Sequence, residues 1–291
     1  MKTLTPILKT ENLTHIYSLG TSFQHTAVED INFEAQKGEF ISVIGHTGSG
    51  KSTFIQHLSG LIRPTSGKVY FKGEDIFSSK EKAREVRFKV GLVFQYPEYQ
   101  LFEETVFKDI AFGPKNMKLS ESEIEERVYE AAGFVGLHES TLQKSPFELS
   151  GGQKRRVAIA GVIAMRPEVL ILDEPTAGLD PRGSANIIAN IRKYHEFTGA
   201  TIIMVTHSME DAAKYTDRMV VLNGGHVDMS GSPQEIFARS DRLREIGLDL
   251  PQVTQIVLRL RELGLPLDSS IYTTEQAAAA ICALKKGGYH A

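Results

Sequence analysis

The sequence predicts an α/β fold: a mixed, largely parallel sheet with helices on both faces, an antiparallel β flank, an inserted helical lobe and a small C-terminal helical extension. Two observations lead to this prediction. Short apolar runs alternate along the chain with longer helical patterns. Several of these runs lack the alternation of half-exposed strands, as expected where both faces of a sheet are covered.

The expected strands fall into two groups. The central strands are the runs without alternation, namely 40–44, 90–94, 169–172 and 201–205. The more alternating runs are 7–17, 28–35 and 68–72. Because alternation is typical of sheets with one solvated face, we expect the second group to form the antiparallel flank.

The helical lobe is expected between Gln95 and Pro167, over about residues 96–167. Within it, Ser120 is predicted to cap a helix, because Glu123 follows three residues later and can close a capping box. Further along, Asn223-Gly224-Gly225 has the composition of a hairpin turn.

The chain of 291 residues is long enough for a main domain with an appendage, which we place at 1–237 and 238–291. In the appendage, Pro251 is expected in the first turn of a helix that ends before Gly264, and Thr274 begins another that runs to Gly287. One stripe of the first helix carries Val253, Ile256, Val257 and Leu260. Because this tail of roughly 55 residues buries little apolar surface alone, we expect it to pack on the main domain or on a neighbouring chain.

The composition gives no bulk electrostatic argument for nucleic-acid binding, because 33 basic and 36 acidic residues leave a net charge of -3. The only cysteine, Cys282, cannot form an internal disulfide, which is typical of a reducing compartment. The longest uncharged apolar stretch, Val157 to Met165, is about half the length of a membrane helix, and the N-terminal residues lack the apolar core of a signal peptide. We therefore expect any work at a membrane to pass through partners.

A P-loop spacing follows the strand 40–44, between that strand and a helix. Its residues are Gly45, His46, Thr47, Gly48, Ser49, Gly50, Lys51, Ser52 and Thr53. Backbone N–H groups of such a loop can surround phosphates, Lys51 can place a charge near the outer phosphates, and Ser52 can offer its hydroxyl to Mg²⁺. The segment therefore predicts a nucleoside triphosphate site.

Two adjacent carboxylates end the strand 169–172. Neighbouring side chains point in different directions, so one role for each is more natural than a shared one. Asp173 suits a ligand to Mg²⁺, and Glu174 suits a base that polarises an attacking water. With the P-loop, this pair predicts a nucleoside triphosphatase.

A second anion site is predicted at Leu149-Ser150-Gly151-Gly152-Gln153, which precedes the basic residues Lys154 to Arg156. Ser150 is a good N-cap, and the two glycines leave N–H groups open at a helix start. The two anion sites could meet within one chain or face different nucleotides, and their spacing does not decide between these arrangements.

Together these motifs resemble the ATP-binding cassette (ABC) ATPase family over residues 7 to about 237. The resemblance rests on 45–53, Gln95, 149–153, Asp173-Glu174, Gly178-Leu179-Asp180 and His207. It implies hydrolysis of ATP with Mg²⁺, and a head-to-tail dimer in which the signature of one chain, 149–153, covers ATP held in the P-loop of the other.

The same resemblance implies roles for individual residues. Lys51, Gln95, Glu174 and His207 would be catalytic, with Gln95 sensing the γ-phosphate and His207 helping to orient the water. Ser52, Gln95 and Asp173 would hold Mg²⁺. Asp180 would lie at the dimer seam, and Tyr17 would stack on adenine.

A narrower resemblance is to the ATPase subunits of energy-coupling factor (ECF) importers for vitamins and trace metals, and more closely to their second, A-prime subunit. The segments that carry it are 45–48, 91–102, 113–117 and 145–148. It implies a sister ATPase, held partly through the C-terminal extension, together with a transmembrane coupling subunit and membrane-embedded substrate-binding subunits. The chain would then lie at the cytoplasmic face of the cell membrane.

The ECF resemblance also implies a docking region for the coupling subunit near Gln95, Glu98, Tyr99 and Phe102, in which Glu98 would receive an arginine. Three alternatives remain: a soluble ABC ATPase not tied to transport, the ATPase of a cobalt or nickel importer, and a nucleotide-binding scaffold that no longer hydrolyses ATP. No long coiled-coil insertion separates Lys51 from Ser150 and the chain carries one cassette, which disfavours the first, while Glu174 and His207 disfavour the last.

Overall fold

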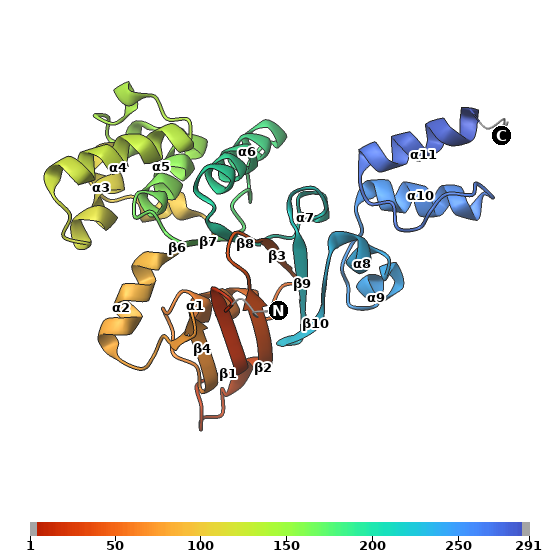
Figure 1. Ribbon diagram of the computed structural model, residues 1–291, viewed down its shortest axis with the longest axis horizontal. Coiled ribbons are helices and arrows are strands. Elements are labelled where there is room, and N and C mark those ends of the chain that lie inside the picture. Colours follow the sequence, from red (N-terminus) through yellow and green to blue (C-terminus); the bar gives the residue numbers. More distant parts are fainter. Residues whose placement is uncertain (1–4, 287–291) are drawn as a thin grey trace.

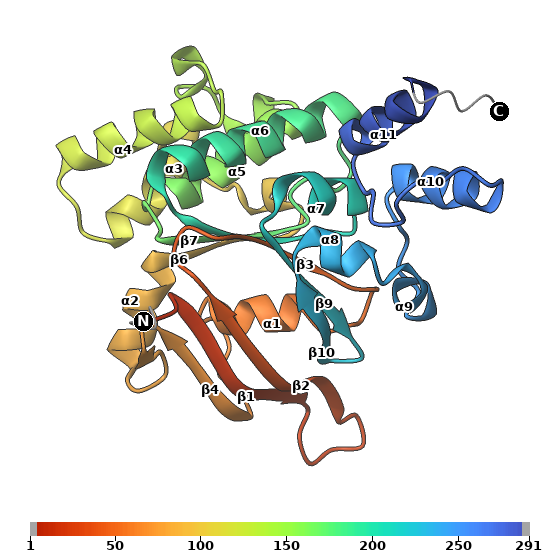
Figure 2. The ribbon, with the colours of Figure 1, turned by 45° about the vertical axis from the view of Figure 1, so that its right-hand side comes forward.

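The computed structural model describes residues 5–286, in which a central sheet separates a helical side from a β-rich side (Figures 1 and 2). The central sheet has six strands in the order β10-β9-β3-β8-β7-β6. Their bounds are β3 Phe40–Ile44, β6 Val90–Val93, β7 Val169–Asp173, β8 Thr201–Val205, β9 Arg218–Asn223 and β10 His226–Gly231. The four predicted central strands are confirmed, and neighbours from β9 to β6 all pair in parallel.

The strand β10 is antiparallel to β9 and is joined to it by the predicted hairpin turn. Asn223 pairs with His226, so Gly224 and Gly225 form a two-residue loop, with φ angles of 54° and 84°. Both angles lie in the left-handed region that glycine adopts without strain, which explains the sequence of this turn.

The antiparallel flank is also confirmed, as a four-stranded sheet in the order β2-β1-β4-β5. Its strands are β1 Leu8–Tyr17, β2 His25–Ala35, β4 Ser66–Phe71 and β5 Glu74–Asp75. The helix α1, Lys51–Leu58, packs between the two sheets, since its Phe54 and Ile55 share a core with Leu8 of β1 and Ile41 of β3. This packing fixes the direction in which α1 leaves the P-loop.

The opposite face of the central sheet carries most of the helices (Figure 2). They are α3 Val106–Asn116, α4 Glu121–Phe134, α5 Gly151–Ile163 and α6 Pro181–Thr198, with short 3-10 helices η1 Pro97–Gln100, η2 Glu139–Thr141 and η3 Pro146–Glu148. The helix α2, Lys80–Lys89, lies on the same side of the sheet as α1, since its Val86 joins the core of Phe54 and Ile55. Val128 of α4, Val157 of α5 and Ile188 of α6 join one core with residues of β7 and β8. The predicted capping box at Ser120 and Glu123 begins α4.

The C-terminal region contains α7 Met209–Tyr215, α8 Pro233–Phe237, α9 Ser240–Glu245, α10 Gln252–Glu262 and α11 Thr274–Lys286. Phe237 of α8 and Leu243 of α9 share a core with Ile44 and Val221, so these helices pack on the central sheet. In contrast, α10 and α11 lie to one side of the molecule (Figure 1) and form a small core of their own around Val257.

The helices expected at Pro251 and Thr274 are present, although Gly287, where the second was expected to end, lies outside the described residues. The expected apolar stripe of α10 is wrong at Ile256, which is exposed. The buried face is centred instead on Val257 and Thr254, whose Oγ1 donates to the Ile271 carbonyl, and this turns Ile256 outward.

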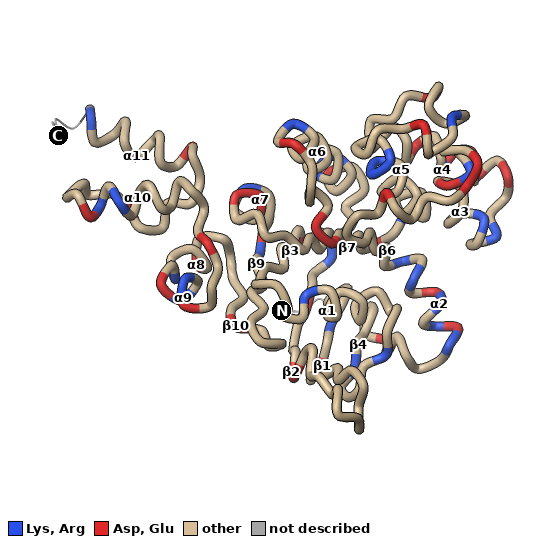
Figure 3. Tube along the Cα trace, turned by 180° about the vertical axis from the view of Figure 1, so that it is seen from behind, with Lys and Arg blue, Asp and Glu red and all other residues tan. Residues whose placement is uncertain are grey.

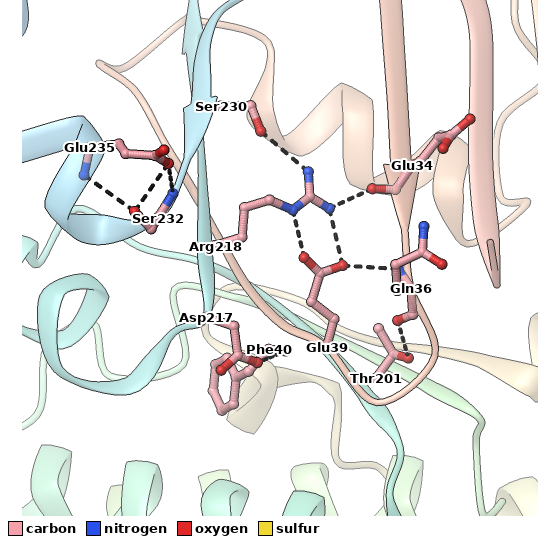
Figure 4. Close-up of polar contacts among 10 residues, drawn as sticks. All are labelled: Glu34, Gln36, Glu39, Phe40, Thr201, Asp217, Arg218, Ser230, Ser232 and Glu235. Carbon is pink, nitrogen blue, oxygen red and sulfur yellow. Dashed lines mark hydrogen bonds and ion pairs between the residues drawn. The ribbon is translucent and has the colours of Figure 1, made fainter. Parts of the chain in front are cut away.

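One arginine joins the two sheets at the amino-terminal edge of the parallel strands (Figure 4). Nε and Nη2 of Arg218 donate to the two carboxylate oxygens of Glu39, at 2.6 and 3.1 Å. The same guanidinium donates to the backbone carbonyl of Glu34 in β2 and to Oγ of Ser230 in β10. The two β layers are therefore fixed together at the edge opposite the site described below.

Charged residues of both signs are interspersed along the trace, as Figure 3 shows for α2 and α4. Among residues 5–286, every helix is too short or too polar to cross a bilayer.

Candidate nucleotide site

The candidate site lies where β3, β7 and β8 end. Val43 of β3 pairs with Val205 of β8, and Val205 also pairs with Asp173 of β7. Because carboxyl ends of parallel strands meet at one edge of a sheet, the loops that follow these strands lie side by side. This register brings together the P-loop, the two carboxylates and His207.

Two glycines in the P-loop are required by close backbone packing. A Cβ on Gly45 would lie 2.4 Å from the carbonyl oxygen of Leu222, and one on Gly50 would lie 2.5 Å from that of Ala27. Gly50 also has a φ of 96°, which other residues adopt only with strain. The neighbouring strands therefore hold the loop in a shape that only glycine allows at these positions.

Lys51 spans this loop. Its Nζ donates to the carbonyl oxygens of Gly45, at 2.7 Å, and of His46, at 2.9 Å. Burial lowers the pKa of the Lys51 ammonium, while the nearby carboxylates of Glu174 and Asp173 oppose this shift. The charge is thus held at the base of the loop, where phosphate oxygens can replace the carbonyl contacts.

Ser52 and Asp173 come together from α1 and β7, with 3.2 Å between the serine Oγ and the aspartate Oδ2. Burial raises the pKa of Asp173, and the hydrogen bond from Ser52 partly offsets that rise. A hydroxyl and a carboxylate are hard oxygen donors, and Mg²⁺ bound with a nucleotide needs only one or two such protein ligands. The donor set fits magnesium, although the described residues contain no group of three or more His, Cys, Asp or Glu arranged to hold a metal.

Glu174 is buried, and its main chain lies in the left-handed region with a φ of 50°. Its Oε2 lies 2.7 Å from Nδ1 of His207, but the pair lacks hydrogen-bond alignment, and this oxygen has no hydrogen-bond partner among the described residues. A buried acceptor without a partner and a strained main chain are costly features that concentrate at functional sites. This carboxylate can accept a proton from a water placed beside it.

A cavity of about 860 Å³ joins these groups. The residues of the predicted site that line it are Tyr17, Gly45, His46, Thr47, Gly48, Gly50, Lys51, Ser52, Thr53, Gln95, Asp173, Glu174 and His207. Ser49 is buried and is absent from the lining. The volume is sufficient for a nucleotide.

The cavity has lining residues that the sequence analysis did not predict, namely His25, Ala27, Met209, Gly247, Leu248 and Asp249. Gly247 to Asp249 belong to the C-terminal region, where no motif marks them. They reach the cavity because Leu248 packs in the same core as Ile44, the last residue of β3. Only the tertiary packing could have identified them.

Tyr17 lies at the rim of the cavity, at the end of β1, and is 42% exposed. Its hydroxyl is 3.2 Å from Oγ1 of Thr53, and the ring of His15 packs edge-on against it at 4.4 Å between centroids. These contacts orient an exposed aromatic ring at the cavity mouth, as stacking on a planar base requires.

The second anion site has the predicted local structure. Ser150 caps α5, and its backbone N–H donates to the Gln153 side chain in a complete capping box. A Cβ added at Gly151 or Gly152 would meet no atom within 4 Å, so the helix start is open to solvent. None of the residues 149–153 lines the 860 Å³ cavity. Within one chain, the two anion sites are therefore separate.

Asp180 is likewise outside the cavity lining. Its Oδ1 accepts a hydrogen bond of 2.7 Å from the Gly183 N–H and caps α6. This helix-capping role is a local function of the residue, and it leaves the predicted place at a dimer seam as a hypothesis.

The predicted docking residues lie on and beside η1. Tyr99 and Phe102 are 84% and 59% exposed, and Phe102 packs edge-on against Phe112 of α3. Glu98, which was expected to receive an arginine of the coupling subunit, forms an ion pair with Arg155 of α5 in the same chain, at 2.7 Å. The aromatic residues of the predicted docking surface are therefore exposed, whereas its acidic residue, Glu98, is paired with an arginine of the same chain.

The family model described as "ABC transporter" matches residues 28–177. Energy-coupling factor transporter ATP-binding protein EcfA2 of Caldanaerobacter subterraneus subsp. tengcongensis is 52% identical over 280 residues, covering 96% of this chain and 98% of that protein.

Two solved structures are similar. One is cbiO1 from Clostridium perfringens, described as part of the ABC transporter complex cbiONQ, with 40% identity, a TM-score of 0.73 and coverage of 89% of this chain and 98% of that one. The other is a dimeric post-hydrolysis state of the ATP-binding cassette MJ0796 bound to ADP and Pi, with 30% identity, a TM-score of 0.70 and coverage of 78% and 98%.

Proposed function

This chain belongs to the ABC transporter family of ATP-hydrolysing subunits, and we propose that it is the motor subunit of an energy-coupling factor importer for vitamins or trace-metal ions. The observation that carries the proposal is the cavity in which the P-loop, Asp173, Glu174 and His207 meet at one sheet edge. The 52% identity to an ECF ATP-binding protein over nearly the whole length supports the narrower assignment.

In the proposed site, the P-loop amides and Lys51 bind the triphosphate, and Tyr17 stacks on adenine at the rim. Ser52, Asp173 and Gln95 would hold Mg²⁺, which neutralises charge on the β- and γ-phosphates when it is bound. The support is the contact of 3.2 Å between Ser52 and Asp173 and the presence of Gln95 in the cavity wall.

Hydrolysis is proposed to depend on Glu174 and His207. Glu174 orients a water and accepts its proton as the water oxygen bonds to the γ-phosphorus and the bond to the β–γ bridging oxygen breaks, which yields ADP and phosphate. His207, which is largely exposed and lies 2.7 Å from Glu174, contacts the γ-phosphate and holds the carboxylate in place. Burial of Glu174 removes competing solvent from the reacting atoms.

We further propose that each nucleotide is enclosed by two protomers, because the open helix start at 149–153 lies outside the cavity of its own chain. In a head-to-tail pair with a sister ATPase, these amides of one protomer face the γ-phosphate bound by the other, and Asp180 lies at the seam. The dimeric form of a similar cassette supports this arrangement.

The transmembrane coupling subunit is proposed to dock near Gln95 and Glu98, on the exposed Tyr99 and Phe102, with Phe112 packed against Phe102. The chain would thereby lie at the cytoplasmic face of the membrane. ATP-driven closing and reopening of the ATPase pair is transmitted through this region to the membrane subunits.

The test of the motor function is Glu174→Gln in the purified assembly of ATPase, coupling and substrate-binding subunits. We expect ATP to bind and turnover at this site to fall by at least 100-fold, because the amide cannot accept the proton. The control is Glu196→Gln, which removes an exposed carboxylate on α6 that pairs with Arg192. Unchanged turnover in Glu174→Gln would remove this residue, and the proposed mechanism, from consideration.

The second candidate is the ATPase of a cobalt or nickel importer. The chain is also similar to cbiO1, part of the ABC transporter complex cbiONQ. Purification from detergent-solubilised membranes, with identification of the accompanying chains and the bound small molecule, separates the two. Exchangeable substrate-binding subunits, whether they carry a vitamin or a trace-metal ion, support the first candidate, and fixed partners with bound cobalt or nickel support the second.

A further inference from the structure

Arg155 is the most deeply buried cation of the helical lobe among the described residues, with 2% of its surface exposed. It lies on α5, two residues after Gln153, which closes the capping box at the start of that helix. Its Nε and Nη2 donate to the two carboxylate oxygens of Glu98, at 3.0 and 2.7 Å. The Glu98 side chain is itself only 15% exposed.

The remaining nitrogen of the guanidinium points to a different segment. Nη1 of Arg155 donates to the carbonyl oxygen of Ala177 at 2.5 Å and, more weakly, to that of Pro175 at 3.4 Å. The Ala177 N–H in turn donates to the carbonyl of Glu174 at 3.1 Å. A continuous chain of polar contacts therefore runs from Glu98 through Arg155 to the main chain of Glu174.

The two segments joined in this way have different proposed tasks. Glu98 lies on η1, beside the exposed Tyr99. The turn 174–177 carries the buried carboxylate of the nucleotide site, in a left-handed conformation that needs support from its surroundings. Tyr96, which follows Gln95, is also left-handed and places its ring 5.9 Å from Cζ of Arg155.

Arginine is suited to this position by its shape. Its planar guanidinium can grip both oxygens of a carboxylate along one edge while a third nitrogen donates elsewhere. Lysine keeps the charge but carries a single nitrogen on a flexible side chain. It cannot donate to both oxygens of Glu98 and, at the same time, to the carbonyl oxygens of Ala177 and Pro175.

We propose that Arg155 is a positioning residue that couples η1 to the turn carrying Glu174. A displacement of η1 by the docked coupling subunit would then change the position of the Glu174 carboxylate in the nucleotide site. The inference rests on the proposed function, because it connects the surface where the coupling subunit docks to Glu174, the residue proposed to orient the water. Arg155 itself touches neither the cavity nor the reacting atoms.

The test measures kcat and KM for ATP, and substrate transported per ATP, in the complete assembly carrying Arg155→Lys or Glu98→Gln. We expect kcat to fall at least tenfold and transport per ATP to fall, with KM for ATP changed less than twofold. Glu98→Gln keeps the size of the side chain but replaces one of the two acceptor oxygens with an N–H donor, so it breaks the two-point contact with Arg155. This variant tests the proposal if Arg155→Lys fails to fold.

The matched control is Arg166→Lys. Arg166 forms a comparable two-nitrogen contact with Glu130, and a contact with Glu126, within the same lobe, and its hydrogen bonds reach neither η1 nor residues 174–177. Its kcat, KM and transport per ATP should remain within twofold of the wild type. The thermal midpoint of each variant, measured alongside, separates general loss of stability from the kinetic effect.

The double variant supplies a further criterion. Because both residues act through one contact, Arg155→Lys with Glu98→Gln should lower kcat no more than the stronger single variant. Independent, multiplying effects, or a normal kcat and transport ratio in Glu98→Gln, would overturn the coupling role. A wild-type assembly that does not hydrolyse ATP would instead contradict the proposed function itself.

Discussion

Nδ1 of His207 lies 2.7 Å from Oε2 of Glu174, a contact between a largely exposed histidine and a buried carboxylate. Because we propose that this histidine positions the carboxylate and contacts the γ-phosphate, His207→Ala should lower ATP turnover by roughly 100-fold, within the range of a positioned acid–base group. Binding of ATP should persist. Steady-state kinetics with nucleotide titration make the measurement.

The matched control is His226→Ala, which removes another histidine–glutamate contact, with Glu29 at 3.5 Å, on β10. It should leave turnover unchanged. Equal losses in the two variants would mean that the 2.7 Å contact has no special role.

The second prediction concerns the shape of the P-loop. Gly50→Ala should destabilise the chain far more than Gly48→Ala, although both glycines have positive φ angles, of 96° and 82°. A Cβ on Gly50 meets the Ala27 carbonyl at 2.5 Å, whereas one on Gly48 meets no atom within 4 Å and costs only about 1–2 kcal/mol of backbone strain. Urea unfolding without nucleotide tests this, and equal midpoints would refute the packing argument.

The third prediction separates helix capping from nucleotide contact. Ser150 and Ser120 begin α5 and α4 with the same complete capping box, so Ser150→Ala and Ser120→Ala should each cost about 1 kcal/mol of stability. Only Ser150→Ala should also reduce ATP turnover in the assembly. If both variants lose turnover equally, Ser150 affects ATP turnover only through helix stability, and the proposed contact with nucleotide is wrong.

The fourth prediction is a pH dependence of stability. Burial lowers the pKa of His57 from 6.5 to about 4, and its Nδ1 lies 3.0 Å from the Ile62 carbonyl. The unfolded chain therefore takes up this proton first, and as the pH falls from about 6.5 to about 4 the chain should lose roughly 3 kcal/mol of unfolding free energy through this group.

His57→Asn, which keeps a donor toward Ile62, should remove this part of the acid dependence, as judged from urea unfolding at several pH values. His138→Asn is the control, because His138 is exposed and caps a short 3-10 helix. The idea fails if His57→Asn and the wild type lose stability in parallel over that interval.

The sequence predicted the parts of the fold that depend on local patterns. Strands such as Thr201–Val205 are buried on both faces and show it as an unbroken apolar run. The helix at 80–89 was missed, because it buries only Ala83 and Val86 and its helical signal lies mainly in the Ser79 cap. A helix with so few buried positions has no periodic pattern to detect.

The same division holds for the site. The P-loop, Asp173 and Glu174 are adjacent in sequence to the strands that place them, so spacing was sufficient to predict them. Arg155 was not predicted, because a basic run at 154–156 is typical of an exposed helix face, whereas this arginine is buried against a glutamate 57 residues away. Burial of a charge depends on its partner, and the partner is specified only by the tertiary fold.

Because residues 149–153 lie outside the cavity of their own chain, the position of a substitution determines which nucleotide pocket of the proposed ATPase pair it disables. A substitution of Glu174 would inactivate the pocket of its own chain, and a substitution of Ser150 would inactivate the pocket of the sister chain. Both substitutions in one polypeptide would therefore inactivate both pockets. If the glutamate change were in this chain and the equivalent serine change in its sister, both would affect the same pocket. The other pocket would stay intact, as it does when either change is present alone.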